Sequence, residues 1–100
     1  MIKHIVMWTL KDQAEGRAKA ENLVAMKALL EALPSLVPGV LELEVAVNPY
    51  GAVPPLDIVL YTVFAGKEDL QAYAVHPEHL KVVDFVKAVA AERRVIDYEL

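Results

Sequence analysis

The stretch "IKHIVMWTL", Ile2–Leu10, alternates with a period of two, which is typical of a β-strand. Residues of one side are Ile2, His4, Val6, Trp8 and Leu10, and those of the other side are Lys3, Ile5, Met7 and Thr9. Both sides are therefore largely apolar, and the stretch "LDIVLYTVFA" at 56–65 has the same property. We expect both faces of the sheet that contains these strands to be covered.

The rest of the chain completes an α+β order. The expected elements are strands at 2–10, 40–47, 56–65 and 94–100, and helices at 12–34, at 66–75 and from Pro77 onward. Pro34 is expected to end the first helix, and the loop "NPYGAVPP" after the second strand is expected to edge a pocket. The order β-α-β-β-α-α-β predicts a ferredoxin-like fold with a four-stranded antiparallel sheet.

The apolar content suggests an oligomer. Hydrophobic residues make up 56% of the chain, above the roughly 45–50% of a typical domain, and a small domain has little interior to hide them. The helices cover only one face of the sheet. The economical solution is a homodimer in which two subunits pair their sheets as a dimeric α+β barrel.

The last helix supports the same idea. Its two apolar stripes are Leu80, Val83, Val86 and Ala90, and Val82, Phe85 and Val89. This surface is wider than one sheet face needs, although a broad face within the subunit is the alternative.

Length and composition exclude several classes of protein. One hundred residues, 1–100, are expected to form a single domain. The chain has no cysteine and shows no signal peptide, which fits a cytoplasmic location. A net charge of −4 with scattered basic residues argues against nucleic acid, and no segment approaches the ~18 apolar residues of a membrane span.

The tetrapeptide His76-Pro77-Glu78-His79 predicts the start of a helix. Proline is favoured at the first helical position, so His76 is the expected N-cap and His79 the third helical residue. The helix dipole and the unpaired N–H groups there push a histidine toward its neutral form. His79 is therefore a candidate general base. The alternative is that both histidines are solvated cap residues.

A metal site is not expected. His76 and His79 could share a metal, but a site needs a third ligand, and His4 is the only other histidine. Ser35 is the only serine and there is no cysteine, which makes covalent catalysis by such a nucleophile improbable. The sequence also has no phosphate loop or dinucleotide fingerprint, so we expect neither a metal nor an organic cofactor.

Two further polar side chains are candidates for the site. His4 lies on the apolar strand side of Trp8, either as a hydrogen-bonded core or rim histidine or as a polar group inside an apolar ligand pocket. Tyr73 precedes His79 by six residues, and its hydroxyl could donate to a carbonyl or enolate oxygen or could simply pack. Asp97 is a strand residue that could orient a histidine.

Four stretches resemble the stress-responsive A/B barrel domain (Dabb) family: "MIKHIVMWTLKD", "VPGVLELEVAVN", "DLQAYAVHPEHLKVVDFV" and "RRVIDYEL". The resemblance spans nearly the whole chain and implies a homodimer of the dimeric α+β barrel superfamily. One plant member is a polyketide cyclase that performs an aldol condensation without a metal or an organic cofactor.

The resemblance to that cyclase implies catalytic roles for His79, Tyr73 and His4 toward a small apolar carbonyl or aromatic ligand. A tyrosine that the cyclase carries in its first long helix has no match in "ENLVAMKALL". A non-catalytic stress-associated dimer and a monooxygenase of the same superfamily remain the alternatives.

Overall fold

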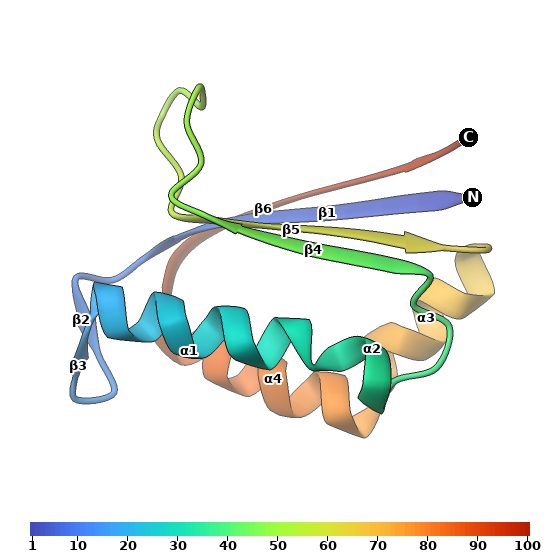
Figure 1. Ribbon diagram of the computed structural model, residues 1–100, viewed down its shortest axis with the longest axis horizontal. Helices are drawn as coiled ribbons and strands as arrows, with labels where there is room; N and C mark the ends of the chain where they lie inside the picture. Colours follow the sequence, from blue (N-terminus) through green and yellow to red (C-terminus); the bar gives the residue numbers. More distant parts are fainter.

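The computed structural model describes residues 1–100 as one antiparallel sheet with helices on one side of it (Figure 1). The main strands are β1 (Ile2–Leu10), β4 (Glu42–Val47), β5 (Ile58–Phe64) and β6 (Ala90–Glu99). The helices are α1 (Lys19–Glu31), α2 (Leu33–Leu36), α3 (Lys67–Val75) and α4 (Pro77–Val89). The strand order is β4-β5-β1-β6. The predicted ferredoxin-like α+β class with a four-stranded antiparallel sheet is confirmed.

The register of the central strand decides which side chains share a face. In β1, His4 lies opposite Thr62 of β5 and Asp97 of β6. Four residues further along, Trp8 lies opposite Arg93 of β6. Residues that oppose each other in an antiparallel pair point to the same side, so all five side chains lie on the face that the helices cover.

The core fills the space between this face and the helices. Its largest fully buried side chains include Phe64 from β5, Met26 from α1 and Leu33 from α2. Thr62 is the buried polar residue of the sheet, and its hydroxyl donates a hydrogen bond to the His4 carbonyl oxygen at 2.6 Å. Burying each large apolar side chain here contributes roughly 1.5–3 kcal/mol, which offsets part of the conformational entropy lost on folding.

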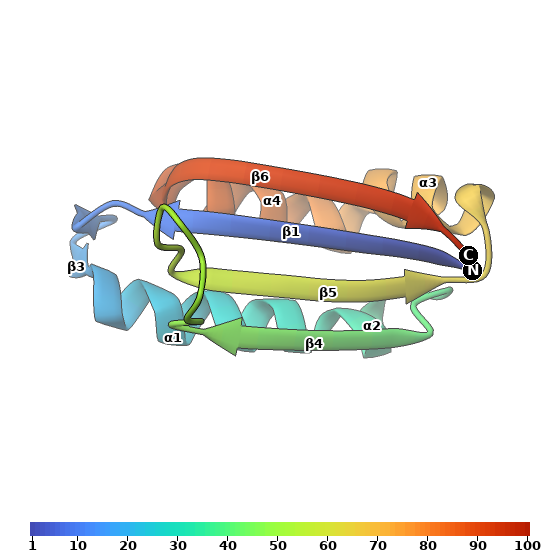
Figure 2. The same cartoon turned by 90° about the horizontal axis from the view of Figure 1, so that it is seen from above.

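The opposite face of the sheet is bare. Figure 2 looks onto it and shows no helix in front of the strands, only the loop between β4 and β5. Ile5 and Ile96 are opposed on this face, and Ile96 is 52% exposed. Lys3 and Tyr61 also lie on it, and the Lys3 ammonium donates to the Tyr61 hydroxyl at 2.7 Å. We expected both faces of the sheet to be covered. Within the single chain the helices cover one face, and the other face stays open.

The first helix begins later than the sequence pattern predicts. A small hairpin of β2 (Gln13–Ala14) and β3 (Arg17–Ala18) precedes it. The chain turns at Glu15 and Gly16, which have φ values of 55° and 72°, in the left-handed region that glycine adopts without penalty. The start of α1 is fixed by Glu21, whose carboxylate accepts the Ala18 N–H at 3.2 Å. The predicted helical start at residue 12 is therefore wrong.

Two other boundaries differ from expectation. Pro34 lies in the first turn of α2 instead of ending α1, which stops at Glu31; proline is tolerated in a first turn because it lacks only an N–H that would be unpaired there. Ala90 does not belong to the apolar stripe of α4, since it is the first residue of β6. None of the helices has the length and apolar character that crossing a membrane requires.

Candidate functional site

A cavity of about 470 Å³ lies between the covered face of the sheet and helices α3 and α4. This volume falls within the roughly 300–1,000 Å³ of small-molecule sites. Ten of its fifteen lining residues are hydrophobic. The cavity brings together the three predicted site residues, His4, Tyr73 and His79. It has the general form of a ligand pocket, apolar with a few convergent polar groups.

His79 is the third residue of α4 and is half-buried at the cavity wall. Its Nδ1 lies 3.0 Å from the carbonyl oxygen of Ala74, an acceptor in the last turn of α3. With the proton on Nδ1 this contact is a hydrogen bond, and the lone pair of Nε2 stays free to accept a proton. Burial lowers the pKa of His79 below its usual 6.5, although the bond to Ala74 opposes this effect.

Tyr73 lies against His79 in the same wall. The two ring centroids are 4.2 Å apart, and the Tyr73 ring is 5.0 Å from that of Phe64. The Tyr73 hydroxyl is buried and has no hydrogen-bond partner. Burial raises the pKa of Tyr73 to about 12, so the hydroxyl keeps its proton at neutral pH and is a donor without an acceptor.

His4 is oriented by a carboxylate across the strand pair. Its Nδ1 contacts Oδ1 of Asp97, which fits the prediction that Asp97 could orient a histidine. The ring of His4 lies edge-on to Phe64 at 6.5 Å. An aromatic row of His4, Phe64, Tyr73 and His79 therefore runs from the sheet to the start of α4.

His76 has a different role from His79. Its Nδ1 accepts the backbone N–H of Glu78 at 3.1 Å, which confirms the prediction that it is the N-cap of α4. His76 is not among the residues that line the cavity. The structure contains no group of three or more histidine, aspartate and glutamate side chains arranged to hold a metal ion.

Three further residues at this cavity were not singled out from the sequence as polar groups of the site. Trp8 lines the cavity, and its indole N–H is buried and unpaired. Arg93 and Lys87 line the same cavity. Trp8 and Arg93 lie opposite each other because of the register between β1 and β6. Periodicity in the sequence does not fix that register, so this pair could not be predicted from the sequence.

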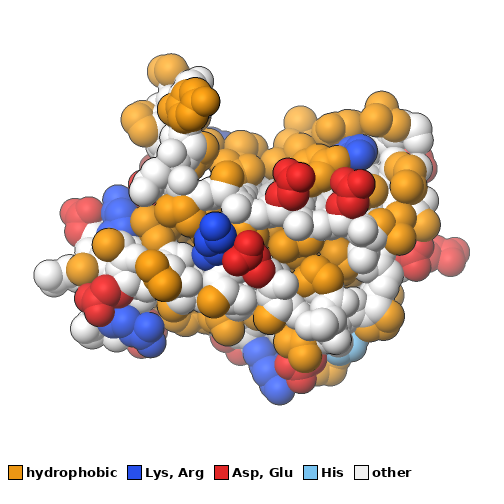
Figure 3. All heavy atoms as spheres, viewed as in Figure 1, with side chains coloured by type: hydrophobic (Ala, Val, Ile, Leu, Met, Phe, Trp, Pro, Cys, Tyr) orange, Lys and Arg blue, Asp and Glu red, His pale blue; other side chains and the backbone are white.

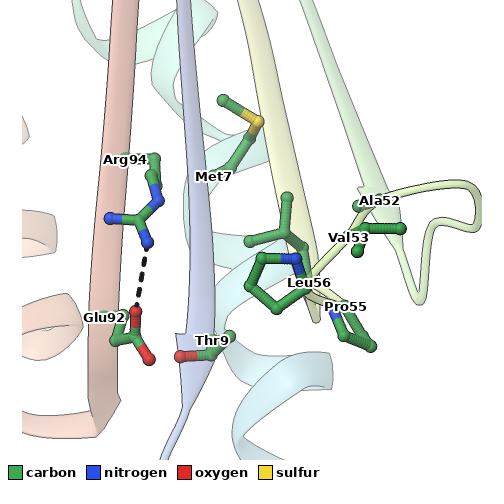
Figure 4. Close-up of a pocket in the computed structure, with 9 residues that line it drawn as sticks. Met7, Thr9, Ala52, Val53, Pro55, Leu56, Glu92 and Arg94 are labelled. Carbon is green, nitrogen blue, oxygen red and sulfur yellow. Dashed lines mark ion pairs between the residues drawn. The ribbon is translucent and has the colours of Figure 1, made fainter.

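A second cavity, of about 150 Å³, lies on the bare face beneath the β4–β5 loop (Figure 4). Met7 and Thr9 of β1 form its floor, and Ala52–Leu56 of the loop lie beside them. Arg94 and Glu92 of β6 close it with an ion pair of 3.5 Å. The loop therefore edges a pocket as predicted, but this pocket is smaller than ordinary ligand sites and lacks histidine and tyrosine.

Comparison with known protein families shows to which family this chain belongs. The sequence profile of the stress responsive A/B barrel domain (Dabb) matches residues 2–100. The chain belongs to this family. No curated protein matches the Dabb chain significantly.

Solved structures share the fold of this Dabb domain. A dimeric protein of unknown function with a ferredoxin-like fold from Bacteroides fragilis is 33% identical, with a TM-score of 0.81 over 99% of this chain and 95% of that one. A Dabb family protein from Mesorhizobium loti is 25% identical, with a TM-score of 0.70 over 99% and 95%. The hydroxynitrile lyase of Passiflora edulis is 16% identical, with a TM-score of 0.78 over 99% and 92%, and shows likeness of fold alone.

Proposed function

We propose that this Dabb protein is a homodimer whose subunits each bind a small carbonyl compound in the 470 Å³ cavity and transfer protons to and from it without a cofactor. The observation that carries the proposal is the meeting of an imidazole and an unpaired buried hydroxyl in one apolar cavity. His79 has a lowered pKa, and the Tyr73 hydroxyl has no partner within the protein. A buried donor without a partner costs about 1–3 kcal/mol, which a ligand oxygen would offset.

In the proposed reaction, Nε2 of His79 takes a proton from the carbon beside the carbonyl group. The C–H bond breaks and its electron pair moves onto the carbonyl oxygen, giving an enolate. The Tyr73 hydroxyl would donate to this oxygen. Because the hydroxyl is buried, surrounding side chains would have to move for the ligand to reach it. His4, held by Asp97, orients the substrate.

The enolate then has two outcomes. It can attack a second carbonyl carbon, forming a carbon–carbon bond as in an aldol cyclisation, after which the new alkoxide takes the proton from His79. It can also take back a proton at carbon, which exchanges hydrogen with water. The sequence resemblance to a polyketide cyclase supports the first outcome.

Proton exchange tests the proposal without knowledge of the natural substrate. Deuterium incorporation beside the carbonyl of 4-phenyl-2-butanone in heavy water is followed by NMR. We expect the protein to accelerate it and His79→Ala to lose roughly 10²–10⁴-fold, the usual contribution of a general base. The substitution His76→Asn is the control, since His76 lies outside the cavity and asparagine can also cap α4. Equal exchange by wild type and His79→Ala would refute the role of His79.

The second candidate function is a non-catalytic ligand-binding or structural dimer. It is favoured by the hydrogen bond of His79 to Ala74, which satisfies a carbonyl at the end of α3 and would be useful without any chemistry. Under this alternative His79→Ala lowers the free energy of unfolding while wild type shows no exchange.

The dimeric state is part of the proposal. It is supported by the bare apolar face of the sheet and by the dimeric state named for the Bacteroides fragilis protein. Hydrophobic side chains also gather at the tip of the β4–β5 loop (Figure 3), where Tyr50 and Val53 are 100% and 97% exposed. Two copies pairing their bare faces would cover these groups and form the barrel predicted from the sequence.

We also assign the protein to the cytoplasm, with neither nucleic acid nor membrane as a partner. The absence of cysteine and the net charge of −4 support this assignment. Fractionation of cells that express a tagged chain tests it, and recovery with the membrane fraction would contradict it.

A further inference from the structure

The cavity has a second polar end, distant from His4 and formed by Arg93 and Lys87. On β6, Arg93 precedes Asp97 by four residues on the same face, which separates the two by about 13 Å. On α4, Lys87 follows His79 by eight residues, which separates them by about 12 Å. Strand and helix agree, so the backbones of Arg93 and Lys87 lie at the end of the cavity away from His4 and His79.

Neither cation is neutralised within the chain. Arg93 and Lys87 take part in none of the ion pairs or side-chain hydrogen bonds of the structure. Their neighbours do: Arg94 pairs with Glu92 at 3.5 Å, and Lys81 pairs with Glu78 at 3.0 Å. Acidic residues outnumber basic ones by 14 to 10 in the chain. A shortage of carboxylates therefore does not explain why Arg93 and Lys87 stay unpaired at this apolar cavity.

Trp8 provides an independent observation at the same end. It lies opposite Arg93 in the sheet, it is 4% exposed, and its indole N–H has no hydrogen-bond partner. An indole N–H can only donate. An unpaired donor on the strand residue opposite Arg93 is suited to an acceptor that carries negative charge, which would reach the buried N–H only if neighbouring side chains moved.

We propose that the cavity is selective for carboxylates, and that its ligand is an oxo acid. This inference rests on the proposed function and adds the substrate class. The carboxylate would accept hydrogen bonds from the Arg93 guanidinium and the Trp8 indole, with Lys87 adding charge. The apolar chain would lie along Val82 and Val86 of α4, and the ketone would reach His79 and Tyr73.

Matched probes test the inference on the intact protein. The acid 7-oxooctanoate and its amide, 7-oxooctanamide, share the ketone and the chain and differ in charge. Isothermal titration calorimetry at low and moderate salt should show the acid binding about 10–100-fold more tightly, the range for hydrogen bonds to a charged group. We expect the preference to weaken as salt rises, because the cations are exposed.

Two double variants test whether Arg93 and Lys87 cause the preference for the acid over the amide. Lys87→Gln with Arg93→Gln should bring the acid to the affinity of the amide. The control, Lys81→Gln with Arg94→Gln, removes the same two charges from the same helix and strand but outside this cavity, and should keep the preference. Equal affinity of wild type for acid and amide, or a preference that survives in the first variant, would overturn the inference.

The outcomes separate this inference from the proposed function. If the amide binds and exchanges deuterium beside its ketone but the acid binds no better, the inference fails and the proposed function stands. If the acid binds by way of Arg93 and Lys87 but neither probe exchanges, the inference stands and catalysis fails. If neither probe binds, both fail.

Discussion

His79 shows how one residue couples stability to pH. Burial lowers its pKa in the folded state below the unfolded value of about 6.5, so the folded protein binds fewer protons there than the unfolded chain. The stability contributed by the neutral ring is therefore fully present above pH 6.5 and is lost as pH falls through the lowered pKa.

The first prediction follows from the lowered pKa of His79. The free energy of unfolding should fall between pH 7.5 and pH 5, and His79→Asn should fall less steeply, because asparagine keeps a donor for Ala74 and does not titrate. Urea denaturation at several pH values measures both slopes. An identical pH dependence in wild type and His79→Asn would contradict the assigned shift.

Tyr73 provides the second prediction, in which stability and activity change in opposite directions. Tyr73→Phe removes a buried hydroxyl that has no partner, so the free energy of unfolding should stay equal or rise by up to ~1 kcal/mol. Proton exchange should fall about 10²–10³-fold, as for other oxyanion donors. A loss of stability above ~1 kcal/mol would mean that the hydroxyl has a partner in the folded protein.

At the scale of elements, Asp57 fixes the end of the β4–β5 loop to the sheet. Its carboxylate accepts the Leu10 N–H at 2.8 Å and pairs with Lys19 at 3.2 Å, while its own N–H donates to the Trp8 carbonyl oxygen at 2.9 Å. One side chain thus connects the loop, β1 and the start of α1.

The third prediction concerns this connection. Asp57→Ala should lower the free energy of unfolding by about 1–3 kcal/mol, because it leaves the Leu10 N–H unpaired in a part-buried place. Asp12→Ala is the matched control: Asp12 also lies near Lys19, at 3.7 Å, but is fully exposed, so its loss should change the free energy of unfolding far less than the loss of Asp57. Equal effects of the two substitutions in thermal or urea unfolding would argue against an anchoring role.

The elements that followed from the sequence are those with a strong period. The alternation of β1 and β5, and the proline that begins α4, each predicted an element that the structure contains. The hairpin at Gln13–Ala18 was missed, because two-residue strands have no period to detect and Gly16 alone does not specify a turn.

The candidate site was predictable where it depends on local position and hidden where it depends on register. The place of His79 at the third residue of α4 follows from Pro77. The nearness of Arg93 to Trp8 follows from how β6 aligns with β1, including a shift in register near Leu10. Short-range patterns do not contain that information. The catalytic roles of His79, Tyr73 and His4 stay a prediction.

At the scale of the whole molecule, the fourth prediction tests the proposed dimer. Ile96 is 52% exposed in the single chain, so Ile96→Lys should alter subunit folding little but place a charge in the proposed interface. We expect a monomer by sedimentation velocity. Leu80→Lys is the control, since Leu80 is similarly exposed, at 47%, but lies on α4 away from the bare face. A dimer that survives Ile96→Lys would place the interface elsewhere.

From Glu92 onward, strand β6 supplies residues alternately to the two sides of the sheet. Arg93 and Asp97 point to the cavity, while Arg94 and Ile96 point to the bare face. A single residue inserted between Glu92 and Arg93, in the regularly paired part of the strand, would therefore turn the following residues over and exchange the two sets of side chains. An even change would only slide the strand along its neighbour. Insertions and deletions in this regular part of β6 are thus constrained by parity, since an odd one would disturb the ligand end and the subunit contact together, whereas the irregularity at Ala91 already takes up one extra residue.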